Sequence, residues 1–415
     1  MKKALKTTIR HLNNAEFSRL RSMCRTAKNL YNQAVYLIRQ EYEATGAYLN
    51  YYAMDRRMKT VTNLEGAINY RLLKAGVSQQ ILRRLDKNYV AYFRALKTWK
   101  AAPEAFRGMP RPPKFLKDTA NLIFDAQRFR VKDGRVFLEK NLSFALPRPL
   151  LSRKIQQLEV IPRHDHFDAV FVYEDGQTNA ARVVSDVAMG VDLGIDNLAA
   201  CVTTTGKSLI VNGKPLKSIN QCYNKQKARL QAQTERRQHV KWSARLERLT
   251  DRRNRRVNDY LHKASRLIVE FARREQVGQV IVGNVAKSMN GVNLGKATNQ
   301  KFTHLPLGQL IDLLRYKLEG HGMSLTVTDE SYTSKASFVD NDALPEKYEA
   351  GKTYPFSGRR VKRGLYRTAA GVLMNADLNG AYNIIRKVVR GFSFSELRKR
   401  IAGRFTPHCR VMTCQ

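Results

Sequence analysis

The stretch "VAMGVDLGIDNLAA", residues 187–200, decides the fold. Its continuous apolar run is typical of a strand in the centre of a sheet, yet the run ends at a charged residue, Asp192. Burying an unpaired carboxylate is costly, so an acid at the tip of such a strand usually holds a cation or a metal. Gly194 lets the backbone approach a ligand, and Asn197 suits the following turn. An ordinary turn acid is the plainer alternative for Asp192.

The segments after this stretch have the element order of an RNase H-like α/β fold. "AACVTTT" and "SLIV" are typical of two further strands. We then expect one basic helical region, a strand, a helix, a strand and a last helix, at 221–274, 277–284, 305–322, 324–330 and 375–389. Three strands followed by helix, strand, helix, strand and helix is the order of that fold.

The charge of the chain points to a polyanionic partner. Lys and Arg number 74 and Asp and Glu 35, for a formal charge of +39. Each cation placed on a phosphate releases a condensed counterion, so we expect nucleic acid as the partner. No long apolar segment is present, and "MKKALKTTIR" lacks the apolar core of a signal peptide. We therefore expect no membrane association and a cytoplasmic location in a bacterium or archaeon.

The cysteines and histidines offer only weak metal sites. Five scattered cysteines argue against a disulfide framework and for a reducing compartment. Cys409 and Cys414 lie beside His408, but there is no second cysteine pair to complete a zinc site. His164 and His166 alternate along a strand-like segment and are a second weak candidate.

The N-terminal half reads as a β unit interrupted by helices. We expect a strand at 4–10, a helix that begins at Asn13 or Asn14 and stops at Gly46, and further helices between about 53 and 100. "FRGMPRPPKF", 106–115, is proline-rich and predicts a linker. Residues 115–175 contain alternating segments and the turn signal Asp133-Gly134, and we expect the first strand to join them in space.

A second acid strengthens the interpretation of Asp192. In "NADLNGAYNIIRK", Asp377 stands at the start of an amphipathic helix. Helix capping and the helix dipole also favour an acid there, so a structural role is the alternative. In an RNase H-like order, an acid on the first strand and one on the last helix are the outer members of a metal-binding triad.

Three segments together resemble the TnpB family, the RNA-guided nucleases of insertion sequences that are related to type V CRISPR effectors. They are "GVDLGIDNLA" (190–199), "GKPLKSINQCYNKQKARLQ" (213–231) and "RGLYRTAAGVLMNADLNGAYNIIRK" (363–387). The resemblance covers about 187–390 and implies a RuvC-like nuclease domain. It also implies that the N-terminal half is a wedge β-barrel interrupted by a helical recognition domain.

This resemblance sets the expected domains. The first strand of the barrel would be 1–12, the recognition insert 13–108 and the rest of the barrel 109–186. The RuvC-like domain would be 187–415, with a basic helical insert at 215–275 and a degenerate ribbon region at 331–374.

The chain departs from the family pattern at two places. The strand after the basic helices usually ends in a catalytic Glu, but "VIVGNVAK" has Gly283 and Asn284 there. The family also carries a zinc ribbon of paired cysteines, whereas the matching region 331–374 contains no Cys. We therefore expect no zinc, and at most a metal-free hairpin in place of the ribbon.

We assign the missing third acid to Glu330, in "VTDESYTSKASFVDND" (327–342). Adjacent strands lie about 4.8 Å apart, so the tip of the fifth strand is roughly 10 Å from that of the first. A Glu there can lean over a small neighbour such as Gly283. Asp329 should point to the opposite face, and Asp340 and Asp342 should be solvated or structural. An ordinary surface acid is the alternative for Glu330.

The expected cofactor is Mg²⁺, as two ions about 4 Å apart, with Mn²⁺ as the alternative. Asp192, Glu330 and Asp377 would be the catalytic residues and the metal ligands. Residues 221–274 hold 16 Lys and Arg against 5 acids, which favours a nucleic-acid surface over a merely solvated one. The expected nucleic-acid-binding residues are Arg236, Arg237, Arg252, Arg253, Arg255, Arg256 and Lys335.

Three functions fit these features. The first is an RNA-guided DNA endonuclease, for which the resemblance implies a guide RNA from the transposon end and target double-stranded DNA. The second is a cleavage-dead RNA-guided DNA-binding protein, such as a repressor, which the missing family Glu keeps open. The third is a transposase without RNA, disfavoured because no His or Tyr nucleophile motif is present.

Overall fold

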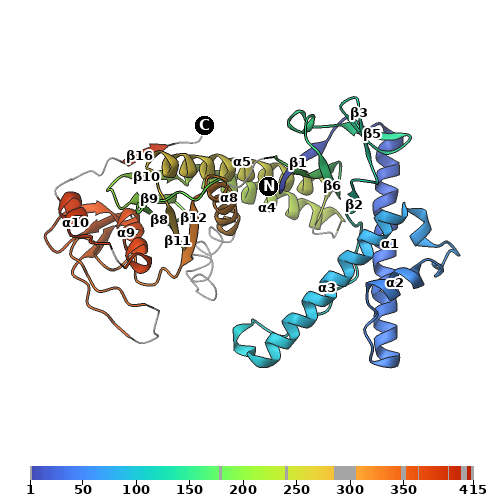
Figure 1. Ribbon diagram of the computed structural model, residues 1–415, viewed down its shortest axis with the longest axis horizontal. Coiled ribbons are helices and arrows are strands. Elements are labelled where there is room, and N and C mark those ends of the chain that lie inside the picture. The colour runs from blue at the N-terminus through green and yellow to red at the C-terminus, as the bar shows by residue number, and fades with distance from the viewer. Residues whose placement is uncertain are drawn as a thin grey trace. The chain divides into compact units, whose positions relative to one another are not determined.

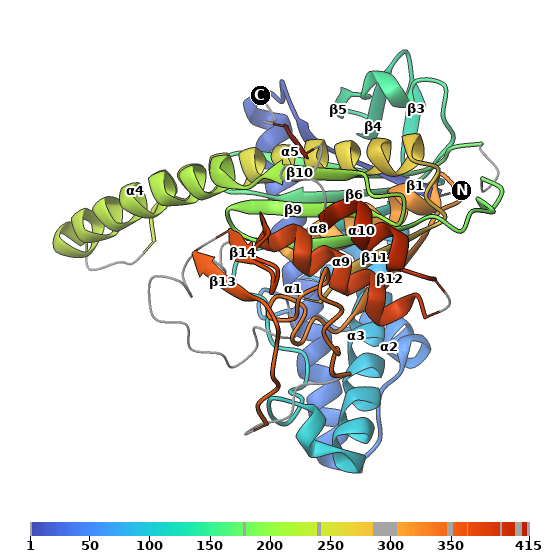
Figure 2. The same ribbon diagram turned by 90° about the vertical axis from the view of Figure 1, so that its left-hand side faces the viewer.

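The computed structural model describes residues 2–176, 180–238, 242–284, 305–346, 352–362, 364–390, 392–402 and 409–412. The chain forms two compact units, Met1–Gln177 and Thr178–Gln415. Figure 1 labels their elements, and Figure 2 turns the view by 90°. In the described part of the chain, no helix has both the length and the apolar character needed to cross a membrane.

The first unit contains two antiparallel sheets. The larger has the order β1-β7-β6-β2, made by β1 (Lys2–Ile9), β7 (Phe167–Glu174), β6 (Ile155–Pro162) and β2 (Leu122–Asp125). The smaller consists of β3 (Arg130–Lys132), β4 (Arg135–Glu139) and β5 (Leu142–Ala145). The pairing of β1 with β7 confirms that the first strand joins the later β segments. Asp133 and Gly134 have φ of 50° and 68°, which confirms the expected β3–β4 hairpin turn.

Between β1 and β2 the chain forms three helices, α1 (Asn14–Thr45), α2 (Tyr51–Met58) and α3 (Ala75–Ala101). Asn13 is the N-cap of α1 and forms a capping box with Glu16, while Gly46 ends the helix with φ 70°. Short 3₁₀ turns lie at Asn69–Leu72, Pro103–Ala105 and Arg148–Leu150. The expected linker contains no strand and lies along α1, because Arg39 donates to Pro113 O at 3.0 Å and stacks on Phe115.

The second unit is built on a mixed sheet with the order β12-β11-β8-β9-β10-β16. Its strands are β8 (Ala188–Leu193), β9 (Asn197–Thr203), β10 (Ser208–Asn212), β11 (Gln279–Gly283), β12 (Ser324–Thr328) and β16 (Cys409–Met412). β8, β9 and β10 are antiparallel, while β11 is parallel to both β8 and β12. The fourth strand thus lies beside the first and the fifth beside the fourth, as the RNase H-like order predicts. The sequence gave no sign of β16, which pairs in parallel with β10.

Helices cover both faces of this sheet. They are α4 (Lys214–Gln238), α5 (Ala244–Arg274), α8 (Leu307–Glu319), α9 (Ala376–Val388) and α10 (Ser395–Ala402). Met189 and Val191 of β8 pack with α5 and α8, whereas Ala188 packs with α9. Figure 2 shows α9 and α10 in front of the strands. Because side chains alternate along a strand, Asp192 shares the α9 face with Ala188.

The cysteine-free ribbon region holds a small antiparallel sheet. Its strands are β13 (Arg359–Lys362), β14 (Leu365–Arg367) and β15 (Leu373–Asn375), and β15 leads directly into α9. A hairpin therefore persists where the family carries its zinc ribbon.

Candidate active site

Asp192 lies near the end of β8, where it pairs with Ala200 of β9. Helix α9 crosses this strand so closely that a Cβ added to Gly380 would lie 2.7 Å from Asp192 Oδ2. Only a residue without a side chain fits at position 380. The first turns of α9 are thereby held against the tip of β8.

Asp377 lies in the first turn of α9, but it does not cap the helix. Asn375 is the N-cap, and its side chain accepts from the backbone N–H groups of Asp377 and Leu378. The capping alternative for Asp377 is therefore wrong. Its carboxylate instead accepts from Asn197 Nδ2 at 2.8 Å and lies 3.3 Å from Arg360 of β13. The sequence pointed to Asn197 only as a turn residue and did not point to Arg360.

Glu330 follows the end of β12, whose last residue, Thr328, pairs with Gly283. A Cβ added to Gly283 would lie 2.7 Å from Glu330 Oε2 and 3.3 Å from Glu330 Cβ. Glu330 thus leans over the position where the family carries its acid. The following turn is fixed because Thr333 donates to Glu330 O from both its backbone and its hydroxyl group.

The three carboxylates form one electrostatic cluster. Burial raises the pKa of Asp192 well above its ordinary value, and the charges of Asp377 and Glu330 raise it further, while Arg360 opposes them. The oxygens do not meet at one point, since no choice of one oxygen from each residue places all three within 4.8 Å of one another. Carboxylate oxygens with a shared negative potential are the donors that a hard divalent cation prefers. The residues present therefore fit the expected Mg²⁺ site.

Two buried asparagines of α9 hold the segment that follows Glu330. Asn379 accepts from Phe338 N at 2.9 Å and donates to Ala336 O at 2.8 Å. Asn383 donates to Thr333 O and Ala336 O. Both are fully buried. One helix thus carries Asp377 and also fixes the chain that leads away from Glu330; the alternation of apolar residues along α9 gave no sign of this role.

Asp329 does not lie apart from α9, as we had expected. The strand ends at Thr328, so the two-residue alternation stops before Asp329. Its carboxylate lies 3.4 Å from the ammonium group of Lys387, which is largely buried in the last turn of α9. Burial acts to raise the pKa of Asp329, but the Ser331 hydrogen bonds and Lys387 outweigh it, and the pKa lies below its ordinary value.

Asp342 does structural work in the ribbon region. It is buried, with 8% of its surface exposed, and accepts from Ser337 N at 2.7 Å and from both the backbone and hydroxyl groups of Ser357. Asp340 accepts from Ala369 N at 2.9 Å. Hydrogen bonds to carboxylates therefore tie together a region in which cysteines and zinc do so elsewhere in the family.

The expected nucleic-acid-binding cations differ in their surroundings. Arg236, Arg252, Arg255, Arg256 and Lys335 are exposed. Arg253 is half-buried between α4 and α5, where it donates to Asn220 and covers the ring of Tyr223. Its contribution to packing was not apparent from sequence. The side chain of Arg237 lies outside the described residues.

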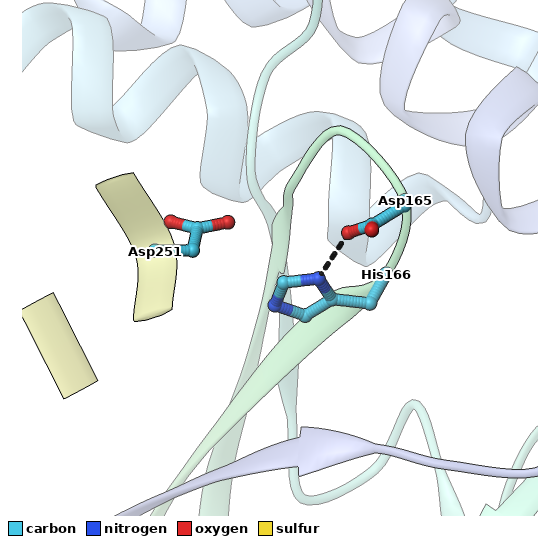
Figure 3. A group of neighbouring side chains, drawn as sticks. All are labelled: Asp165, His166 and Asp251. Carbon is cyan, nitrogen blue, oxygen red and sulfur yellow. Dashed lines mark hydrogen bonds and ion pairs between the residues drawn. The ribbon is translucent and has the colours of Figure 1, made fainter. Parts of the chain in front are cut away.

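The weak metal candidates are accounted for differently. The ring of His166 lies 2.7 Å from Asp165 Oδ1 (Figure 3) and 3.6 Å from Asp168, which also pairs with Arg163 and Lys6. This is an ion-pair network at the β6–β7 turn. His408 and Cys414 lie outside the described residues, as does the side chain of Cys409.

Comparisons with known families match most of the second unit. A family model described as a probable transposase (OrfB_IS605) matches residues 170–289. A second, described as the Cas12f1-like TNB domain, matches residues 308–384. The TnpB-like protein ORF457 of Acidianus two-tailed virus is 25% identical over 220 residues, which are 51% of this chain and 44% of the viral protein. The match thus spans less than half of that relative.

Comparisons with solved structures extend over both units. The structure of a Cas12f1–sgRNA–target DNA complex matches with a TM-score of 0.54 and 14% identity, covering 92% of this chain and 98% of the other. Alicyclobacillus acidoterrestris C2c1 with single-guide RNA matches with a TM-score of 0.41 and 9% identity, covering 92% and 68%. The first likeness, with the strand order of the second unit, identifies a RuvC-containing α/β nuclease fold. Within that class, the two family matches and the viral relative show that the chain belongs to the TnpB family.

Proposed function

We propose that the chain is an RNA-guided DNA endonuclease of the TnpB type, with Asp192, Glu330 and Asp377 as its catalytic carboxylates. The observation that carries the proposal is the position of Glu330 over Gly283. It supports the return of a third acid to a cluster that the substitution at the family position would otherwise leave with two. Guide pairing would select the target, and the protein would read duplex shape and a short adjacent motif.

The same three residues would hold the metal ions. Two divalent ions, Mg²⁺ or Mn²⁺, would activate a water molecule and stabilise the leaving oxygen of the phosphodiester. Asn197 holds one carboxylate oxygen of Asp377 at 2.8 Å and so fixes the orientation of this ligand. Lys387 anchors Asp329, the residue before Glu330. The chain thus positions two of its three acids through fixed partners on β9 and α9.

The remaining parts would hold nucleic acid. The exposed arginines of the α4–α5 hairpin provide a surface for the phosphates of a guide strand or heteroduplex. We further propose that residues 1–12 and 109–186 form a wedge barrel around the recognition insert 13–108, and that 187–415 is the nuclease domain. The RNA partner would come from the transposon end.

A reconstitution experiment tests the function. The full chain is co-expressed with the flanking transposon-end sequence, and the co-purified RNA is sequenced. The complex is then mixed with linear double-stranded DNA that carries a matching target, with Mg²⁺ or with EDTA. Mg²⁺-dependent cleavage of the matched target supports the endonuclease. Tight RNA-dependent binding without cleavage would instead support the repressor-like alternative, and sequence-specific binding by RNA-free protein would contradict both.

A further inference from the structure

A basic hollow in the first unit lies apart from the carboxylate cluster. Its volume is about 640 Å³, within the range of small-ligand sites. The smaller sheet provides most of its wall, together with the start of α3. Five cations line it, and they are Lys74, Arg128, Arg130, Lys132 and Lys140.

The hollow carries an excess of positive charge. Glu139 is its acidic lining residue, and Arg19 neutralises this carboxylate through two hydrogen bonds of 2.7 and 2.8 Å. Lys74 is taken up by the carbonyl groups of Leu138 and Arg128, so it shapes the wall. These contacts leave the cations of the β3–β4 hairpin to attract an anion.

Two of these cations have no competing partner. Within the described part of the chain, Arg130 and Lys140 make neither an ion pair nor a side-chain hydrogen bond. Arg128 is only loosely paired, since its Nε lies 3.8 Å from Asp125, beyond hydrogen-bond distance. An anionic ligand would therefore displace no strong ion pair.

An aromatic ring stands directly beside the free cation. Phe137 lines the hollow and is only partly buried, and in the β3–β4 register it is the cross-strand partner of Arg130. Directly opposed residues of an antiparallel pair project on the same face, with their Cβ atoms about 5 Å apart. A nucleotide has this combination of groups, because its base stacks on a ring while its phosphate contacts a neighbouring cation.

We infer that this hollow binds one unpaired RNA nucleotide, with its base against Phe137 and its phosphate on Arg130 and Lys140. The inference rests on the RNA partner of the proposed function. Bases in a duplex remain stacked on each other, whereas loops and bulges of RNA offer single bases to aromatic side chains. Gln127 lines the same hollow, and its amide group can bond a 2′-hydroxyl group, which DNA lacks.

The test uses the full chain and a defined probe, a 12-nucleotide oligouridylate carrying 4-thiouridine. Ultraviolet crosslinking followed by tryptic mapping should place a crosslink on residues 136–140. Phe137→Leu keeps an apolar side chain but removes the ring. It should weaken oligouridylate binding by about 5- to 100-fold, the usual effect of losing one stacked base, and leave binding of a 12-base-pair RNA duplex unchanged.

Charge loss is controlled separately. Arg130→Ala with Lys140→Ala should weaken oligouridylate binding more than Lys97→Ala with Lys100→Ala, which removes the same charge from exposed sites on α3. Crosslinks elsewhere only, unchanged binding by Phe137→Leu, or equal crosslinking to thymidylate DNA would overturn the inference. If Phe137→Leu binds RNA normally while the complex cleaves its target, only this inference fails. If the unmodified chain binds no RNA, the proposed function fails with it.

Discussion

The side chain of Glu330 lies over Gly283, so close that a Cβ at position 283 would be 2.7 Å from its carboxylate oxygen. Thr328 and Gly283 pair across the parallel strands β12 and β11, and the chain turns toward α9 just beyond them. The glycine that replaces the family acid therefore provides the space in which a different acid stands. Loss of one carboxylate and gain of the other are structurally coupled.

Gly283→Ala tests this coupling. The added methyl group must displace Glu330, and we expect cleavage to fall by about 10- to 100-fold, since a misplacement of about 1 Å costs this much in catalysis. Guided DNA binding should be unchanged. Gly308→Ala is the matched control, because a Cβ there meets nothing within 4 Å. Equal loss of cleavage in both variants would mean that Gly283 has no special relation to the site.

An acid restored at the family position gives the reciprocal test. We expect Gly283→Glu to recover part of the cleavage lost in Glu330→Ala, because both side chains address the same pocket. Asn284→Glu in the same background should not rescue cleavage, since its side chain points to the other face of β11. Rescue by Asn284→Glu alone would show that the register of the acid is different.

The raised pKa of Asp192 predicts how the stability of the metal-free protein depends on pH. An acid whose pKa is raised by folding lowers the free energy of unfolding when it is ionised. This loss is complete above the folded pKa and disappears as the pH falls toward the ordinary value near 4. In EDTA at neutral pH, Asp192→Asn should raise Tm by roughly 2–6 °C, and the gain should shrink at lower pH.

Two controls isolate this effect. Asp340→Asn removes the same charge outside the cluster and should give no comparable gain. Mg²⁺ should raise the Tm of the unmodified protein more than that of Asp192→Asn, because a bound cation stabilises the folded state in proportion to its affinity. A Tm of Asp192→Asn at or below that of the unmodified protein in EDTA would contradict the electrostatic account.

The arginines of α5 should separate into two classes. The triple variant Arg252→Ala, Arg255→Ala and Arg256→Ala should weaken RNA binding and reduce its salt dependence, by up to about 0.9 in log–log slope per lost phosphate contact. Its Tm should change little. Arg253→Ala should instead lower the free energy of unfolding by about 1–2 kcal/mol, because it loses Asn220 and the ring of Tyr223. Similar Tm and salt slopes for all four positions would remove the distinction.

The ribbon region should depend on Asp342 and not on zinc. Asp342→Ala leaves buried donors of Ser337 and Ser357 without an acceptor and should cost about 1–3 kcal/mol, with faster hydrogen exchange across 331–374. Asp340→Ala, which loses one hydrogen bond at a more open site, should be milder. Elemental analysis should find well under one zinc per chain. Stoichiometric zinc that is released together with loss of the ribbon fold would overturn this view.

The sequence predicted much of the second unit because burial imposes clear patterns there. The continuous apolar strand before Asp192 and the two-residue alternation fixed the strand order and the face of the sheet. The same alternation misled us at Asp329, because it ends with β12 and gives no information on the turn beyond. The roles of Asn379, Asn383 and Asn197 depend on contacts between residues more than 40 positions apart, which no local pattern records. Arg360 and β16 were missed for the same reason.

The measurement that tests the central proposal most directly is guided cleavage by the unmodified protein and by Glu330→Ala, side by side in Mg²⁺. We expect the unmodified complex to cut its matched target. Glu330→Ala, like Asp192→Ala and Asp377→Ala, should bind the target nearly as well but not cut it, because a two-metal site needs all three hard ligands to offset the repulsion between the ions. Full cleavage by Glu330→Ala would refute the relocated glutamate, and bound but uncut target with the unmodified protein would favour the repressor-like function.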